Sequence, residues 1–196
     1  MNKKIWLSLA HMSGREQDFI KEAFDTNWVV PLGPNVNAFE EDLKQFVGKD
    51  CHGQAREVVA LSAGTAAIHL ALIACGVKAG DEVCVQSFTF CASSHPITYL
   101  GATPVFIDSE RDTWNMDPAL LEEAILDRIA KTGKKPKAII PVALYGMPYD
   151  CEKIMAIAEK YDIPVIEDAA EGFGSKYKGQ VLGTFGRYGV LSFNGN

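Results

Sequence analysis

One stretch of the chain combines residue types that bind phosphate. It is the run Ser62-Ala63-Gly64-Thr65-Ala66-Ala67, which stands between an apolar segment and a helical one. Backbone N–H groups at the start of a helix are unpaired and lie at the positive end of its dipole, so they bind anions. Gly64 lets a ligand approach the backbone closely, and the Thr65 hydroxyl adds a donor. Because serine is also a common helix cap, the pattern taken alone favours that simpler explanation.

A second stretch brings carboxylates to the end of an apolar segment. In the run Val165 to Glu171, Glu167 and Asp168 follow residues that are typical of a buried strand. A carboxylate in this position could serve a ligand that contains a pyridine ring. Placed beneath the ring nitrogen, it would keep that nitrogen protonated, and the ring would then accept electrons from a carbanion at the attached amine carbon. An acid at this position can equally cap a following helix, and the sequence leaves both interpretations open.

Two further stretches follow apolar segments and carry a hydroxyl group or aromatic rings. The run Gly189 to Phe193 alternates at strand period and then opens into the polar turn Asn194-Gly195-Asn196, which places Ser192 at a sheet edge. The run Ser87 to Ser93 contains two phenylalanines. Stacking of Phe90 on a cofactor ring would be worth about 1 kcal/mol beyond burial, whereas core packing is the usual fate of phenylalanine.

The elements that must position these residues alternate between strands and helices from Glu57 onward. Strands are predicted over the apolar ranges 58–61, 82–86, 103–108, 138–144 and 165–168. Helices are predicted over 66–75, 92–100, 118–130 and 151–161, the third with Asp117 as its cap and Pro118 at its first position. This alternation indicates an α/β fold with a mainly parallel sheet flanked by helices, which binds ligands where its strands end.

The first fifty residues are predicted to be helical. Ser13 and Glu16 form a capping box before apolar residues at helical spacing, so a first helix is expected to end near Asp25. The apolar loop Trp28 to Pro34 either packs on a neighbour or lines a pocket, and packing is the favoured interpretation. A second helix presents an apolar face made of Val36, Phe39, Leu43 and Phe46.

The composition is that of a globular protein and excludes several functional classes. The chain has 196 residues, of which 47% are hydrophobic and 22% charged, and its net charge is −6. This charge argues against nucleic acid or an anionic membrane as the main partner. The five cysteines lack Cys-x-x-Cys spacing, which indicates reduced thiols in a cytoplasmic protein, and the four histidines lack metal-ligand spacing. The N-terminal apolar run is too short for an export signal, and no run is long enough for a membrane span.

Taken together, these stretches resemble the cofactor site of the DegT/StrS sugar aminotransferases, which use pyridoxal 5′-phosphate. The resemblance runs from His11-Met12-Ser13-Gly14, through Pro31-Leu32-Gly33-Pro34, to Ser192-Phe193-Asn194-Gly195-Asn196. In that family the last stretch reads Ser-Phe-(His/Asn)-x-x-Lys, and the lysine carries the cofactor. The catalytic lysine is therefore expected directly after Asn196, and the chain is expected to be the N-terminal part of a family member.

The resemblance implies the architecture of a fold type I aminotransferase. Residues 1–50 would form an N-terminal helical segment with a substrate-side loop, and residues 51–196 would form part of the large domain that binds pyridoxal phosphate. A small C-terminal domain would lie outside this sequence, which leaves the chain incomplete at its C-terminus. The family also implies a homodimer with an active site shared between the subunits.

Individual residues receive roles from the same resemblance. Four of them would hold the cofactor phosphate: Gly64, Thr65, Ala66 and Ser192. Phe90 would stack on the cofactor ring, and Asp168 would be the catalytic carboxylate at the pyridine nitrogen. Glu171 stands where many relatives have Gln or His beside the ring hydroxyl, so its carboxylate needs a proton or another partner. Asn194 occupies a position that is often histidine and would face the sugar substrate.

The implied reaction is the transamination of a nucleotide-linked keto-sugar. The run Gly183-Thr184-Phe185-Gly186, together with Ser192 to Asn196, is most similar to the branch that aminates C4 of UDP-4-keto-6-deoxy-N-acetylhexosamines. Glutamate would be the amino donor, and the product would serve the synthesis of cell-surface glycans or glycoconjugates. Two alternatives stay open: a pyridoxal phosphate-dependent sugar 3-dehydratase, in which histidine replaces the lysine, and a catalytically inactive binding fragment.

Overall fold

Two compact units make up the computed structural model, which describes residues 4, 11–50 and 53–193. The smaller unit consists of the described parts of Met1–Phe46, Glu57–Ala60 and Phe193–Asn196. The larger unit consists of the described parts of Val47–Arg56 and Leu61–Ser192. Across residues 11–50 and 53–193, no helix combines the length and the apolar character that crossing a membrane requires.

The smaller unit contains the helices α1 (Glu16–Asp25) and most of α2 (Pro34–Val47). The carboxylate of Glu16 accepts hydrogen bonds from the backbone N–H groups of Ser13 (2.6 Å) and Gly14 (3.0 Å). One half of the predicted capping box is therefore present, and α1 ends at Asp25 as predicted. The Ser13 hydroxyl accepts a hydrogen bond from the N–H of Arg15, whereas in a complete capping box it would accept from the N–H of Glu16.

The strand predicted over residues 58–61 is absent from the described structure, and this prediction is wrong. Charged side chains of α2 hold the segment instead of a neighbouring strand. The backbone N–H of Ala60 donates to the Glu40 carboxylate (2.8 Å), and the Lys44 ammonium pairs with Glu57 (2.8 Å). Val59 is 72% exposed, so the apolar residues that suggested a strand bury little of their surface here.

Parallel strands form the centre of the larger unit. They are β1 (Glu82–Gln86), β2 (Thr103–Ile107), β3 (Ala138–Ile140), β4 (Ile166–Asp168) and β7 (Tyr188–Val190). Strand β1 pairs with β2 and β3, and β4 pairs with β7, all in parallel. Parallel bridges from Ile139 to Val165 and from Val142 to Asp168 join β3 to β4, which gives the order β2-β1-β3-β4-β7. The mainly parallel sheet expected from the sequence is therefore present.

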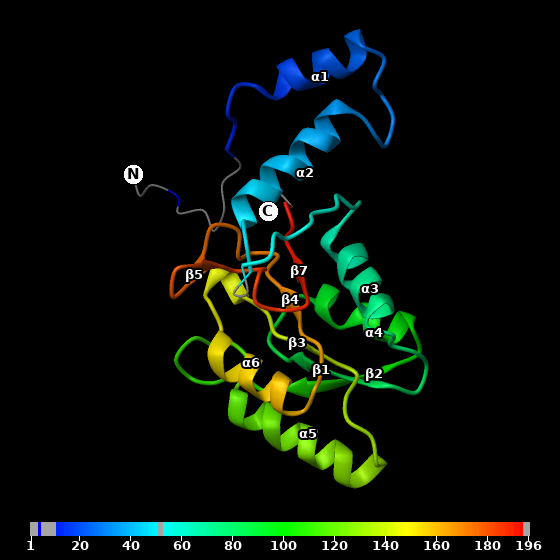
Figure 1. Cartoon of the computed structure of the whole chain (residues 1–196), viewed down its shortest axis with the longest axis vertical. Helices are drawn as coiled ribbons and strands as arrows, with labels where there is room; N and C mark the ends of the chain where they lie inside the picture. The colour runs from blue at the N-terminus through cyan, green and yellow to red at the C-terminus, as the bar shows by residue number, and fades with distance from the viewer. Residues whose placement is uncertain (1–3, 5–10, 51–52, 194–196) are drawn as a thin grey trace. The chain divides into compact units, whose positions relative to one another are not determined.

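Helices cover both faces of this sheet (Figure 1). The helices α3 (Gly64–Ala74) and α4 (His95–Tyr99) share one apolar cluster with Val83 and Val85 of β1. The helices α5 (Pro118–Thr132) and α6 (Cys151–Lys160) share a second cluster with Cys84 of the same strand. Successive side chains of a strand point to opposite faces, so this division shows that both faces of the sheet are buried.

Proline divides the helix predicted over residues 92–100. The structure has a short 3₁₀ helix, η1 (Cys91–Ser93), followed by α4, with Pro96 in the first turn of α4. Because proline has no N–H and disfavours helical backbone in the residue before it, a new helix begins here. The helices predicted over 66–75, 118–130 and 151–161 agree with the structure to within two residues at each end. The loop after Gly172 leads into a small hairpin of β5 (Lys176–Tyr177) and β6 (Gln180–Val181).

The cap predicted for α5 gives a direct test of the fold. The Asp117 carboxylate accepts hydrogen bonds from the N–H groups of Ala119 (2.7 Å) and Leu120 (3.3 Å). We expect Asp117→Ala to lower the free energy of unfolding by about 1 kcal/mol, because these amides lose their acceptor. Asp117→Asn keeps an acceptor and is the matched control in urea unfolding of the full-length protein. Equal stability of the two variants would contradict the cap.

Candidate active site

The carboxyl ends of β4 and β7 bring two predicted site residues to one edge of the sheet. Asp168 is the last residue of β4 and pairs in register with Val190 of β7. The N–H of Ala169 then donates to the carbonyl of Val190 (2.9 Å), which fixes the two strands at this end. Ser192 follows Val190 by two residues, so its hydroxyl and the Asp168 carboxylate reach the same edge.

The amino end of α3 presents backbone donors without a side-chain cap. Its N-cap is Ala63, whose backbone is extended, and no side chain in the described structure accepts a hydrogen bond from the first turn. The first main-chain bond of the helix runs from the N–H of Ala67 to the carbonyl of Ala63 (3.1 Å). The amides of Gly64, Thr65 and Ala66 precede it and have no acceptor within the helix. The alternative of a helix capped by Ser62 is therefore not what the structure shows.

Ser192 lies directly beside this helix start. A Cβ atom placed on Gly64 would lie 3.2 Å from Cβ and 3.3 Å from Oγ of Ser192. Any side chain at position 64 would therefore occupy the space between the free amides and the serine hydroxyl. Amide and hydroxyl donors at the positive end of a helix dipole form a cup that suits a phosphate group.

The Asp168 carboxylate is buried and hydrogen-bonded. The residue is 4% exposed, its Oδ2 accepts from the Ser93 hydroxyl (2.6 Å), and its Oδ1 accepts from the N–H of Ala170 (3.2 Å). Burial raises the pKa of the Asp168 carboxyl, the bonds from Ser93 and Ala170 oppose that rise, and the charge of Glu171 adds to it. Donors to the charged form thus oppose the desolvation of this buried carboxylate, although its pKa remains raised.

Asp168 does not cap a helix, although the sequence left that interpretation open. The chain after β4 runs through turns to the hairpin strand β5, and no helix begins there in the described structure. The role of helix cap is therefore wrong for this residue. A buried carboxylate at the carboxyl end of a strand is instead a candidate ligand-binding group.

Phe90 stands at the same edge with its ring uncovered. It is the N-cap residue of η1, the short helix that contains Ser93, and it is 77% exposed. Phe88 is 48% exposed and meets the ring of Trp114 edge-on, with 6.3 Å between ring centroids. Neither phenylalanine lies in the core, so that alternative is wrong for both. The exposed ring of Phe90 is free to stack on a planar ligand.

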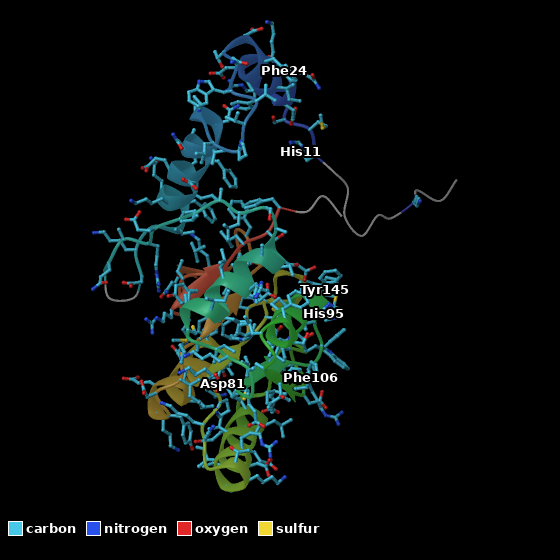
Figure 2. The ribbon with its side chains drawn as sticks, turned by 90° about the vertical axis from the view of Figure 1, so that its right-hand side faces the viewer. His11, Phe24, Asp81, His95, Phe106 and Tyr145 are labelled. Carbon is cyan, nitrogen blue, oxygen red and sulfur yellow. The ribbon has the colours of Figure 1, made fainter. Side chains whose placement is uncertain are left out.

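Glu171 finds a partner in the backbone of the neighbouring loop. Its Oε2 accepts a hydrogen bond from the N–H of Tyr145 (2.6 Å), in the 3₁₀ turn η2 (Leu144–Gly146). Tyr145 has a positive φ of 51°, and its ring is 69% exposed and projects from the larger unit (Figure 2). The departure from Gln or His at position 171 is therefore compatible with a hydrogen-bonded carboxylate, because an amide supplies the donor.

Two buried amide side chains that the sequence analysis missed hold the loops at this edge. Gln86 Oε1 accepts from the N–H groups of Met116 (2.8 Å) and Val142 (3.3 Å). Asn115 Oδ1 accepts from the N–H of Leu144 (3.1 Å), and Asn115 Nδ2 donates to a carbonyl in the same loop. Both residues have no exposed surface. They join the loops after β1, β2 and β3, and only the position of Gln86 at a strand end gave a sequence signal.

The remaining candidates contribute less to this site. Asn194 lies outside the described residues. Lys178 lies on the β5–β6 hairpin, where its ammonium pairs with Glu152 (2.6 Å) and both side chains are largely exposed, so it is a solvated lysine. His69 packs edge-on against Tyr99, with 5.7 Å between ring centroids. Within the described ranges, no three His, Cys, Asp or Glu side chains gather as metal ligands would.

The loop Trp28 to Pro34 both packs and lines a hollow within the smaller unit. The ring of Trp28 lies against Gly33, where a Cβ atom would come within 3.1 Å of it. Residues of the loop and of α1 surround a small cavity, among them Ala23, Thr26, Val30 and Leu32. Both interpretations of the loop are thus realised in part, and its role as a substrate-side loop stays an expectation.

Comparison with known proteins identifies related sequences over almost the whole chain. A model of the DegT/DnrJ/EryC1/StrS aminotransferase family matches residues 11–196. The chain is 55% identical over 196 residues to EpsN of Bacillus subtilis (strain 168), an alignment that covers 100% of this chain and 49% of EpsN. It is 40% identical over 185 residues to GDP-perosamine synthase of Escherichia coli O157:H7, covering 94% of this chain and 47% of that protein.

Solved structures of related proteins have the same fold as this chain. The apo-form of Spr1654 from Streptococcus pneumoniae superposes with a TM-score of 0.86 and 31% identity, over 98% of this chain and 49% of that one. Its PLP-form superposes with a TM-score of 0.79 and 30% identity, over 94% and 47% of the two chains. The chain therefore spans about half the length of the proteins that it matches.

The contact between Ser93 and Asp168 predicts a measurable change in acidity. We expect Ser93→Ala to raise the pKa of the Asp168 carboxyl further, because the charged form loses a hydrogen bond worth about 1.5–3 kcal/mol. The readout is a carbon-13 NMR titration of the aspartate carboxyls in the full-length protein. Ser94→Ala is the matched control, since the Ser94 hydroxyl donates to the carbonyl of Cys91 (3.3 Å) and, within the described residues, makes no hydrogen bond to Asp168. An unchanged pKa in Ser93→Ala would contradict the assignment.

Proposed function

Because the chain belongs to the DegT/DnrJ/EryC1/StrS aminotransferase family, we propose that it supplies the pyridoxal phosphate-binding part of an enzyme that aminates a nucleotide-linked keto-sugar. The larger unit has the fold type I aminotransferase architecture that the sequence led us to expect. One observation carries the proposal: the Ser192 hydroxyl lies beside the free amino end of α3, while Asp168 ends the strand paired with β7.

The residues at this edge fit pyridoxal phosphate group by group. The cup between Gly64 and Ser192 offers amide and hydroxyl donors to a phosphate and is kept open by the absence of a side chain at position 64. Asp168 offers a buried carboxylate to a protonated ring nitrogen, and Phe90 offers an uncovered aromatic face. These are the residue types that a phosphorylated pyridine ring requires of its site.

Each residue of the candidate site then has a defined physical role. When bound, pyridoxal phosphate supplies an electron sink that stabilises negative charge at the carbon carrying the amine. Asp168 holds a proton on the ring nitrogen, and Ser93 favours the ionised form of Asp168. The α3 amides and Ser192 would hold the phosphate and so orient the ring, and Glu171 would be the residue nearest the ring hydroxyl. The lysine expected directly after Asn196 would carry the cofactor and move the proton.

The substrate assignment rests on the resemblance of two sequence runs. Gly183-Thr184-Phe185-Gly186 and Ser192 to Asn196 favour a UDP-4-keto-6-deoxy-N-acetylhexosamine as acceptor and glutamate as amino donor. One relative is named GDP-perosamine synthase, and that name refers to a GDP sugar. The choice of UDP as the nucleotide therefore rests on the two sequence runs alone. We also propose a cytoplasmic homodimer that serves glycan synthesis, with Asn194 facing the sugar.

Transamination by the full-length protein is the experiment that tests this function. With pyridoxal phosphate, L-glutamate and the UDP-4-keto-sugar, we expect 2-oxoglutarate and amino-sugar to form one for one, because each amino group leaves the donor before it reaches the sugar. The products are measured by mass spectrometry. A deoxygenated keto-sugar in place of the amino-sugar would indicate the 3-dehydratase, and no turnover would indicate an inactive binding protein. Preference for a GDP sugar would contradict the nucleotide assignment.

An Asp168→Asn variant separates the chemistry from binding in the same assay. The amide cannot hold the ring proton, so turnover should fall by on the order of 10²–10³ while the cofactor stays bound through its phosphate. Asp162→Asn is the matched control, because Asp162 is an exposed carboxylate paired with Lys135. Full activity of Asp168→Asn would exclude Asp168 as the catalytic carboxylate.

A further inference from the structure

The backbone between β6 and β7 is held by a buried carboxylate that the mechanism above does not use. Glu167 precedes Asp168 on β4 and therefore points to the opposite face of the sheet. It has no exposed surface. Its hydrogen-bond partners are Tyr149 and the segment 182–187, which leads directly into β7 and then to Ser192.

Glu167 accepts hydrogen bonds from three donors with its two oxygens. Oε1 accepts from the backbone N–H of Gly183, and Oε2 accepts from the N–H of Phe185 (3.2 Å). The hydroxyl of Tyr149 also donates to Oε2 (2.8 Å). Each oxygen thus fixes one amide of the segment, and both amides would lack this acceptor without a carboxyl group at position 167.

Both protonation states of Glu167 can serve this purpose. Burial raises the pKa of Glu167 to about 7, and the bonds from Tyr149 and the loop amides oppose that rise. When protonated, the acid can donate to the Tyr149 oxygen while its two oxygens still accept from Gly183 and Phe185. A glutamine cannot do the same, because its –NH₂ group would face one of the two amide donors.

Arg56 fixes the carbonyls of the same segment from another side. Its Nη2 donates to the carbonyls of Thr184 (2.7 Å) and Gly186 (3.0 Å). A carboxylate therefore binds N–H groups of the segment while a guanidinium binds its C=O groups. The other branch of the guanidinium, Nη1, contacts the carbonyl of Arg187 (3.5 Å), so the planar fork reaches three carbonyls in a fixed geometry that a lysine ammonium does not offer.

The segment also lies close to β7 and to the residue before β4, with no space for a side chain at two glycines. The Gly183 carbonyl contacts Gly189 of β7 so closely that a Cβ atom on Gly189 would clash with it. A Cβ atom on Gly186 would lie 2.7 Å from the carbonyl of Val165. A displacement of Gly183 therefore moves β7, and Ser192 lies only three residues beyond Gly189.

We propose that Glu167 is a positioning residue of the phosphate cup: it fixes the segment 182–187 and β7 so that the Ser192 hydroxyl lies against Gly64. This inference rests on the proposed function, since it takes the cup to bind the phosphate of pyridoxal phosphate. A residue that only stabilised the fold would affect all ligands of the site alike. A positioning residue of the cup should instead affect a ligand that carries a phosphate more strongly than a ligand that lacks one.

The test compares pyridoxal phosphate with pyridoxal, which lacks the phosphate, as ligands of the full-length protein. We expect Glu167→Gln to raise the Kd of pyridoxal phosphate roughly tenfold, because one amide loses its acceptor and Ser192 shifts. The Kd of pyridoxal should stay within about twofold of the wild type, since it makes no use of the cup. Both are measured by absorbance titration.

A double-mutant cycle with Ser192→Ala links the effect to the cup. If Glu167 acts through Ser192, the double variant should bind pyridoxal phosphate about as weakly as either single variant, whereas independent effects would multiply to roughly a hundredfold. Ile125→Val, a buried core change in α5, is the matched control that lowers stability without touching the segment. Its Kd for pyridoxal phosphate should equal that of the wild type.

Two results would overturn the inference: multiplicative effects in the cycle, or an equal loss of affinity for pyridoxal. If Glu167→Gln does not fold, Arg56→Lys provides the second variant, because it weakens the hold on the same segment from the carbonyl side and should show the same ligand selectivity. Failure of the proposed function would appear separately, as a wild-type protein that does not prefer pyridoxal phosphate to pyridoxal.

Discussion

The parallel pairing of β4 with β7 is the constraint on which the candidate site depends. It sets Asp168 opposite Val190 and leaves Ser192 just past the paired residues, so a carboxylate and a hydroxyl reach one edge of the sheet. Val190 shares its apolar cluster with Ile68 of α3, which accounts for the closeness of Ser192 to the start of that helix. A slip of one residue would exchange the positions of Glu167 and Asp168, and the buried side chains on both faces oppose such a slip.

Local sequence rules predicted most of the elements that build this edge. The strand over 82–86 was predicted with its observed bounds, because a short apolar run rich in β-branched residues and flanked by turn residues is typical of a buried strand. The Asp117 cap followed from capping preferences, whereas α3 was predicted from its apolar run and begins at Gly64 without a side-chain cap. The strand expected at 58–61 failed because its fate depends on partners far away in sequence: the side chains of Glu40 and Lys44 take its place in the hydrogen bonding.

The polar contacts that complete the site could not be predicted, because each joins residues that only the fold brings together. The Ser93 hydroxyl reaches Asp168 across 75 residues of sequence, and Gln86 reaches Asn115 across 29. The sequence placed two adjacent acids at a strand end without saying which would face the ligand edge. Strand phase decides this, since Asp168 meets Ser93 while Glu167 meets the segment before β7. Buried polar residues of this kind are fixed by the tertiary structure, not by local pattern.

Borohydride reduction of the full-length protein, followed by tryptic mapping, tests the central claim most directly. The claim is that the edge formed by β4, β7 and α3 holds pyridoxal phosphate, with a lysine directly after Asn196 as its attachment point. The account predicts a peptide that begins at Tyr188, after cleavage at Arg187, and carries the added mass of the reduced cofactor. Absence of any adduct, or an adduct on Lys176 or Lys178 of the β5–β6 hairpin, would contradict it.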